Sequence, residues 1–218
     1  MAYELPVMLN CEGRLCLIIG GGKVAERKAS ALREAGARLR VISPLLKSAR
    51  LAEWADDGSI EWKARAYREG DLNGAFLVHA ATDAPEVNAK IAADADRLGI
   101  LVNVASEGSS GSFTNPAVLR RGRLTVAIAT SGAGPMASVT IKEQLEHQFG
   151  EEYEAYLDFL YRMRTAIKDE VELPEQRRRL LHKLYRLDIL EEIQRGDNAN
   201  APWDPDKIKQ WIEQNREE

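Results

Sequence analysis

A chain of 218 residues is long enough to bury a core in one or two domains. Its 44% hydrophobic and 29% charged residues are ordinary for a globular protein and exclude a disordered chain. The formal net charge of −4 gives no general reason to expect nucleic acid or an anionic membrane as a partner. The start Met1–Pro6 lacks a basic segment, and the apolar stretch 15–19 is far shorter than the roughly 20 residues of a membrane span. We therefore expect a cytoplasmic protein without a membrane segment.

Short apolar runs alternate with amphipathic stretches through the first half of the chain. Four runs predict buried parallel strands: 15–19, 39–42, 76–80 and 100–104. Residues 60–64, after the Asp-Asp-Gly turn at 56–58, predict a further strand of the same sheet. Three amphipathic stretches between them predict helices: 24–35, 45–56 and 85–98. Strands that alternate with helices form right-handed crossover units. The predicted fold class is therefore α/β, with a Rossmann-type doubly wound parallel sheet.

The pattern changes from Ser112 onward. Apolar runs at 113–119 and 124–130 flank the basic turn 120–123 and leave no room for a crossover helix, which predicts a hairpin. Beyond the glycine-rich break at 132–135 the pattern is helical to the end. We predict three parts: a Rossmann-type domain over 1–111, a hairpin and helix dimerisation region over 112–150, and a C-terminal helical domain over 151–218.

Cysteines and histidines do not form a metal-binding pattern. Cys11 and Cys16 are spaced as neither a CxxC redox pair nor a four-ligand zinc site, so we interpret them as buried thiols beside the first strand. His79, His147 and His182 are far apart in the sequence, and His79 lies in an apolar strand, which is typical of a satisfied core histidine. We expect no metal site.

A glycine-rich turn follows the first predicted strand. Gly20, Gly22 and Ala25 form a G-x-G-x-x-A pattern between this strand and an amphipathic helix, as in dinucleotide-binding folds. Gly20 allows the tight turn, Gly22 lets the backbone approach a pyrophosphate, and Ala25 lets the helix pack on the strand. The helix N-terminus offers unpaired N–H groups and a partial positive charge. We predict that Gly20, Gly21 and Gly22 bind the pyrophosphate of a dinucleotide cofactor.

The second strand lacks the acidic residue that usually binds the ribose hydroxyls of NAD. It ends at Ser43 and Pro44 instead. Ser43 can bond a ribose hydroxyl, whereas Arg38 or Arg40 can favour a 2′-phosphate if either side chain points toward the site. The residues alone therefore leave NAD and NADP both open.

Several segments resemble the precorrin-2 dehydrogenase family, which includes the N-terminal half of bifunctional sirohaem synthases. The sequence GGGKVAERK over 20–28 is similar to the opening signature of that family. Further matches follow in the family's order: Ala80–Asp83 with Asn88, Val102–Val104, Ser112–Phe113 with Pro116, and Thr130–Pro135. The resemblance covers about residues 5–150. It implies a homodimer that oxidises precorrin-2, a tetrapyrrole, to sirohydrochlorin with NAD, and some members also insert iron.

The resemblance also implies site residues. The implied cofactor contacts are Lys23 and Val24 at the turn, Pro44 and Leu45 along the adenosine half, and Thr82 and Asp83 at the carboxyl edge of the next strand. Asn103 and Thr130 match family positions and are predicted at the substrate. A tetrapyrrole with many carboxylates needs basic groups, for which Arg120 on the hairpin is a candidate; the alternative for any such arginine is a solvated surface.

One departure from the family concerns proton handling. The family places an aspartate after the fifth strand, where this chain has Ser106 followed by Glu107. Removal of a hydride from the macrocycle must be accompanied by proton loss, and a serine is a poor general base. Either Glu107 or solvent takes the proton. The same departure leaves iron insertion open.

Two readings compete with a dehydrogenase acting on a porphyrinoid. A Rossmann-type domain that binds NAD with little or no turnover would be a sensor or scaffold, and turnover separates this reading from the first. A dehydrogenase of another small metabolite is the other alternative, because a fold does not fix a substrate.

Overall fold

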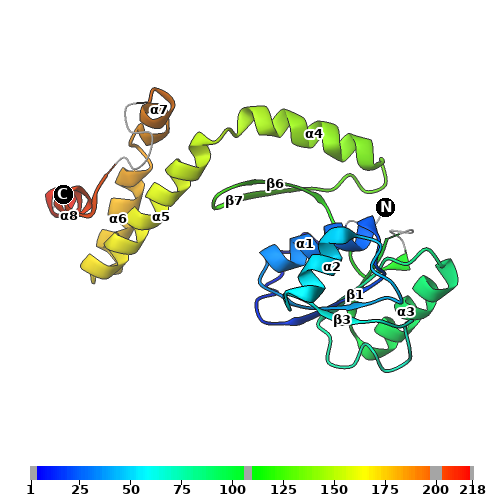
Figure 1. Cartoon of the computed structure of the whole chain (residues 1–218). Coiled ribbons are helices and arrows are strands. Elements are labelled where there is room, and N and C mark those ends of the chain that lie inside the picture. The colour runs from blue at the N-terminus through cyan, green and yellow to red at the C-terminus, as the bar shows by residue number, and fades with distance from the viewer. Residues whose placement is uncertain (1–3, 106–109, 197–202, 217–218) are drawn as a thin grey trace. The chain divides into compact units, whose positions relative to one another are not determined.

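The chain forms two compact units, residues 1–115 and 116–218 (Figure 1). In this computed structural model the structure describes residues 4–105, 110–196 and 203–216. No helix in these ranges is long and apolar enough to cross a membrane. The finer division of the second half at 150 stays a prediction.

The first unit is built on a parallel sheet of five strands in the order β3-β2-β1-β4-β5. The strands are β1 (Leu15–Ile19), β2 (Arg38–Ile42), β3 (Glu61–Lys63), β4 (Leu77–Ala80) and β5 (Leu101–Val104). From β1 the chain builds outward to β2 and β3 and then returns to β4 on the other side. The order therefore reverses between β1 and β4, which is where open α/β sheets bind ligands. The predicted α/β doubly wound fold is confirmed.

Helices cover both faces of this sheet (Figure 1). They are α1 (Lys23–Glu34), α2 (Ala49–Asp56) and α3 (Pro85–Leu98). Ile18 and Val41 point to one face, where they pack in a cluster with Ala29 of α1 and Leu51 of α2. The alternate strand residues point to the other face and pack with Ile91 of α3. Both faces are apolar because β1, β4 and β5 are buried on two sides, as their near-continuous apolar runs predict. The three residues of β3 are exposed instead.

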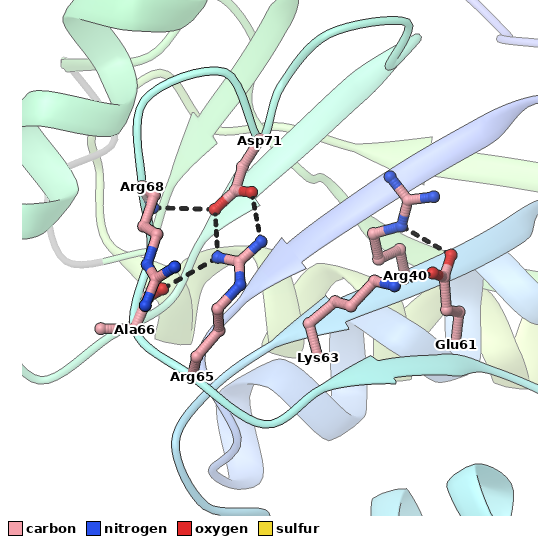
Figure 2. A network of polar contacts seen from close by, with 7 residues as sticks. All are labelled: Arg40, Glu61, Lys63, Arg65, Ala66, Arg68 and Asp71. Carbon is pink, nitrogen blue, oxygen red and sulfur yellow. Dashed lines mark hydrogen bonds and ion pairs between the residues drawn. The ribbon is translucent and has the colours of Figure 1, made fainter.

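Charged side chains occupy the edge strand of the sheet. β3 pairs with β2 alone, and Glu61 on β3 accepts a 2.6 Å hydrogen bond from Arg40 on β2 (Figure 2). Lys63 pairs with the same carboxylate at 2.7 Å. Charges on an edge strand discourage pairing with a foreign strand. Arg40 is therefore engaged in an ion pair between the two edge strands.

The loop from β3 to β4 is held by one carboxylate. Asp71 accepts two hydrogen bonds from the Arg65 guanidinium, at 2.7 and 2.6 Å, and one of 2.8 Å from the backbone N–H of Arg68 (Figure 2). The hydrogen bonds from Arg65, and next the one from Arg68, hold the pKa of Asp71 below its ordinary value despite partial burial. Bidentate arginine pairs of this kind are among the stronger polar contacts in proteins.

The second unit begins with an antiparallel hairpin of β6 (Ala117–Arg121) and β7 (Leu124–Ile128). The first strand was predicted to begin at 113, but the backbone N–H groups of Ser112 and Phe113 donate to Val102 of β5 instead. Pro116 then has no N–H for a ladder. The turn is also shorter than predicted, because Arg121 pairs with Leu124 and only two residues connect the strands.

Helices make up the rest of the second unit. They are α4 (Pro135–Gln148), α5 (Glu152–Glu170), α6 (Pro174–Leu184), α7 (Ile189–Gln194) and α8 (Pro205–Asn215). Phe159, Met163 and Ile167 of α5 lie one helical turn apart and form a buried stripe against α6, α7 and α8. By contrast, α4 packs along the hairpin and buries none of its residues.

We expect Asp71→Asn to lower the free energy of unfolding by about 2 kcal/mol at pH 7, because the amide cannot accept the paired charge-assisted hydrogen bonds. The pKa of Asp71 is depressed by folding, so its contribution is present above the unfolded value near 3.8 and is lost as the pH falls through the folded value. Urea unfolding should show a constant difference from pH 7 to 5 that shrinks below about pH 4. Glu69→Gln, which removes an exposed 3.4 Å pair with Arg97, is the control and should change little. An equal loss in both variants would contradict this assignment.

Candidate functional site

The glycine turn between β1 and α1 is tightly enclosed on two sides. A Cβ on Gly20 would lie 2.2 Å from the carbonyl oxygen of Ala81, and Gly20 has a φ of 132°, which side chains rarely adopt. A Cβ on Gly21 would lie 2.2 Å from the carbonyl oxygen of Leu45. No side chain but hydrogen fits at either position, so both glycines are needed for packing.

Gly22 differs from its two neighbours. It is the N-cap of α1, its φ of −95° suits any residue, and a Cβ there would meet nothing within 4 Å. No side chain caps the helix. The first N–H groups of α1 have no partner within the helix, as at any helix N-terminus. The turn thus offers an anion room, donors and the positive end of a helix dipole, which fits the pyrophosphate of a dinucleotide.

The start of α1 is fixed by packing and by one polar contact. Ala25 is fully buried against the sheet, as the motif predicts, while Lys23 and Val24 are exposed. Glu26 accepts a 2.6 Å hydrogen bond from Ser48, whose hydroxyl oxygen also caps α2 by accepting from the N–H of Leu51. The two helix N-termini are thereby tied together beside the turn.

The loop after β2 forms one wall of the site. Ser43 is buried, and its hydroxyl donates to the carbonyl oxygen of Leu45 at 2.8 Å. The indole N–H of Trp62 donates to the carbonyl oxygen of Ser43 at 3.0 Å. Pro44 and Leu45 are exposed. Of the residues predicted along the adenosine half, Pro44 and Leu45 are thus accessible, whereas the Ser43 hydroxyl already has a partner within the loop.

The loop after β4 forms the other wall. Asn88 of α3 is buried; its side-chain oxygen accepts from the N–H and the hydroxyl of Thr82, and its amide donates to the Thr82 carbonyl. The Thr82 hydroxyl oxygen also accepts from the backbone N–H of Ala84 at 3.2 Å. Asn88 therefore fixes the position of this loop. The sequence alone does not predict that role, but the family pattern, which places Asn88 six residues after Thr82, already pointed to this residue.

One ion pair connects the two walls. The ammonium of Lys47, in the loop after β2, lies 3.3 Å from the carboxylate of Asp83, in the loop after β4. The hydrogen bond from Lys47, above all, lowers the pKa of Asp83, so the carboxylate is ionised near neutral pH. The family resemblance implies a cofactor contact for Asp83, whereas no motif in the sequence points to Lys47.

A buried polar group lies within the same unit, on the α1 face of the sheet. His79 of β4 contacts the side-chain oxygen of Asn103 at 3.0 Å, and the Asn103 amide donates to the carbonyl oxygen of Phe113 at 3.1 Å. Burial, and next the charge of Lys28, lower the pKa of His79 to about 4, so the imidazole is neutral. His79 is a satisfied core histidine, as expected. The Asn103 side chain is buried and holds the segment after β5.

The remaining predicted residues lie elsewhere. Arg120 is exposed on β6, and Thr130 donates to the carbonyl oxygen of Gly134 at 3.4 Å in the turn before α4; both belong to the second unit. Ser106 and Glu107 lie outside the described residues. Within the described ranges no cluster of three or more His, Cys, Asp or Glu is placed to hold a metal ion. Cys11 and Cys16 are buried free thiols, which confirms their interpretation.

Known proteins share this arrangement. A family described as putative NAD(P)-binding matches residues 7–117. Siroheme synthase 1 of Aeromonas salmonicida is 37% identical over 198 residues, and siroheme synthase of Nitrosococcus oceani is 35% identical over 197 residues. Each alignment covers 90% of this chain but only 42% of the relative, so the chain spans less than half the length of these proteins.

A solved structure matches over the full length. The chain of SirC, precorrin-2 dehydrogenase, is 30% identical with a TM-score of 0.76, and the match covers 99% of this chain and 100% of that one. Both the glycine turn and the helical second half lie within this match. The chain therefore belongs to the precorrin-2 dehydrogenase family, and its N-terminal half belongs to the putative NAD(P)-binding family.

Proposed function

We propose that this protein oxidises precorrin-2 to sirohydrochlorin with NAD as the hydride acceptor. The observation that carries the proposal is the glycine turn at the point where the strand order reverses, in a chain that matches a precorrin-2 dehydrogenase along its full length. When bound, the dinucleotide supplies the oxidant. The protein's own residues bind and orient it: Gly22 with the first turn of α1 at the pyrophosphate, Lys23 and Val24 beside the turn, Pro44 and Leu45 along the adenosine, and Thr82 at the opposite wall.

Substrate binding and proton removal complete the proposal. The macrocycle carries many carboxylates, and Arg120 is proposed to bind one of them. Asn103 and Thr130 stay substrate positions that the family pattern implies, while the Asn103 side chain here bonds His79 and Phe113. Glu107 is proposed to take the proton that leaves with the hydride, since Ser106 occupies the family's aspartate position.

A homodimer is also part of the proposal, with the interface supplied by residues 112–150. No residue of α4 is buried, and Met136 is 72% exposed, with Val139 and Ile141 near 40%. A helix with this apolar content needs a partner surface, and a second copy is the commonest one.

Gly22→Asp should abolish NAD binding while leaving the fold intact. The new carboxylate would occupy the pyrophosphate position and repel it. Because the φ of Gly22 suits any residue and aspartate is a good N-cap, we expect the melting temperature to stay level or rise slightly. Isothermal titration with NAD and a thermal melt of the same sample measure both. Gly22→Ala adds bulk at the same place without a charge, so it should weaken binding less than the aspartate does. Near-wild-type affinity in the folded aspartate variant would remove the site from this turn.

Glu107→Gln should lower turnover of precorrin-2 by about 10²-fold or more with unchanged NAD affinity, because the amide keeps the shape and loses the basicity. The assay follows the absorbance of the macrocycle and of NADH together. Glu213→Gln on α8 serves as control. A rate within a few-fold of wild type would show that solvent takes the proton, and it would leave the dehydrogenase itself in place.

Sedimentation velocity at micromolar concentration should give twice the mass of one chain. Val139→Asp, which places a charge on the exposed face of α4, should shift the protein toward monomer. Glu213→Lys on α8, an exposed position outside residues 112–150, controls for a general effect of charge. A wild-type monomer would contradict the homodimer.

A further inference from the structure

The Lys47–Asp83 ion pair joins the loops after β2 and β4, which both contact the glycine turn. Lys47 follows β2, and its backbone N–H donates to the carbonyl oxygen of Gly21 at 2.8 Å. Asp83 follows β4, two residues after Ala81, which packs against Gly20. The glycine turn thus lies between the two backbones, and the 3.3 Å contact of their side chains joins one side of the turn to the other.

The two charges of this pair have opposite effects on the binding of a pyrophosphate. An ammonium beside the turn attracts the phosphates, and a carboxylate at the same place repels them. Both side chains are largely exposed, 66% for Lys47 and 88% for Asp83, so neither is held by packing and each is free to change partner. The backbone of Lys47 is fixed to the turn, which keeps its ammonium within reach of whatever binds there.

We infer that Lys47 binds the pyrophosphate of the dinucleotide, and that Asp83 holds the same ammonium in the free protein. The inference rests on the proposed function, and it adds a binding residue that neither the glycine motif nor the comparisons identify. Cofactor binding then exchanges one anionic partner of Lys47 for another. A lysine suits this exchange because its ammonium is a compact charge on a flexible stem, free of the fixed geometry of a guanidinium.

The direction in which Asp83→Asn changes the affinity for NAD decides between two roles for Asp83. If Asp83 competes with the phosphates for Lys47, Asp83→Asn tightens NAD binding by a few-fold. If Asp83 instead accepts a hydrogen bond from the dinucleotide, the same change weakens binding. Lys47→Met should weaken binding by about tenfold or more, because it removes the attraction and leaves the carboxylate free to repel. The double variant should fall between the two single variants.

Isothermal titration of NAD into the full chain tests these expectations. Lys209→Met is the matched control, since Lys209 also pairs with a carboxylate, that of Glu170 at 3.4 Å, and is 61% exposed. The control variant should bind NAD with the affinity of wild type. Lys47→Met should weaken the binding of ADP-ribose as much as that of NAD. It should leave the binding of adenosine, which lacks phosphates, unchanged. Raising the salt concentration should weaken NAD binding more steeply in wild type than in Lys47→Met.

The possible outcomes distinguish a failure of this inference from a failure of the proposed function. A wild-type chain that binds no NAD overturns both. If wild type binds NAD and Gly22→Asp does not, the cofactor site stands; Lys47→Met within twofold of wild type then overturns the inference alone. Weaker binding in Asp83→Asn also overturns it and assigns Asp83 a direct contact with the dinucleotide.

Discussion

The contact of the glycine turn with two carbonyl groups is the constraint on which the candidate site depends. The carbonyl oxygen of Ala81 lies so close to Gly20, and that of Leu45 so close to Gly21, that a side chain at either glycine would clash. These contacts place the loops after β2 and β4 against the turn, and the carbonyl of Gly21 accepts hydrogen bonds from the start of α2 as well. A tripeptide therefore sets the positions of both walls, and the open space at Gly22 is what this packing leaves for a ligand.

The buried polar group behind the site has a different task. Asn103 links His79 on β4 to the carbonyl of Phe113, and Lys28 of α1 donates to Asn115 at 3.0 Å, at the last residue of the first unit. Burial lowers the pKa of Lys28 to about 8, since the ammonium is poorly solvated there. These contacts satisfy polar groups that are costly to leave unpaired and fasten the chain where it leaves the sheet.

Much of this arrangement could be predicted from the sequence because it depends on local patterns. Apolar runs identified four strands, the turn at 56–58 pointed to the fifth, and the glycine motif identified the phosphate-binding turn, since these signals lie within a few adjacent residues. The Lys47–Asp83 pair could not be found in this way, because its members are 36 residues apart and each resembles an ordinary surface charge. Asp71 and Arg65 are closer in sequence, but nothing local shows that they pair. The start of β6 was misplaced because Ser112 and Phe113 bond to β5, a tertiary contact that overrides their apolar pattern.

The uncapped first turn of α1 also links the occupancy of the site to the lifetime of the protein. Gly22 has no side chain to accept from the leading N–H groups, which an α-helix leaves without partners of its own. On the proposed function the phosphates complete this helix, and a ligand at a hundredfold its dissociation constant stabilises a folded protein by about 2.7 kcal/mol. Chains without cofactor would open more often and meet proteases more often, so the supply of dinucleotide would govern how much of the protein persists.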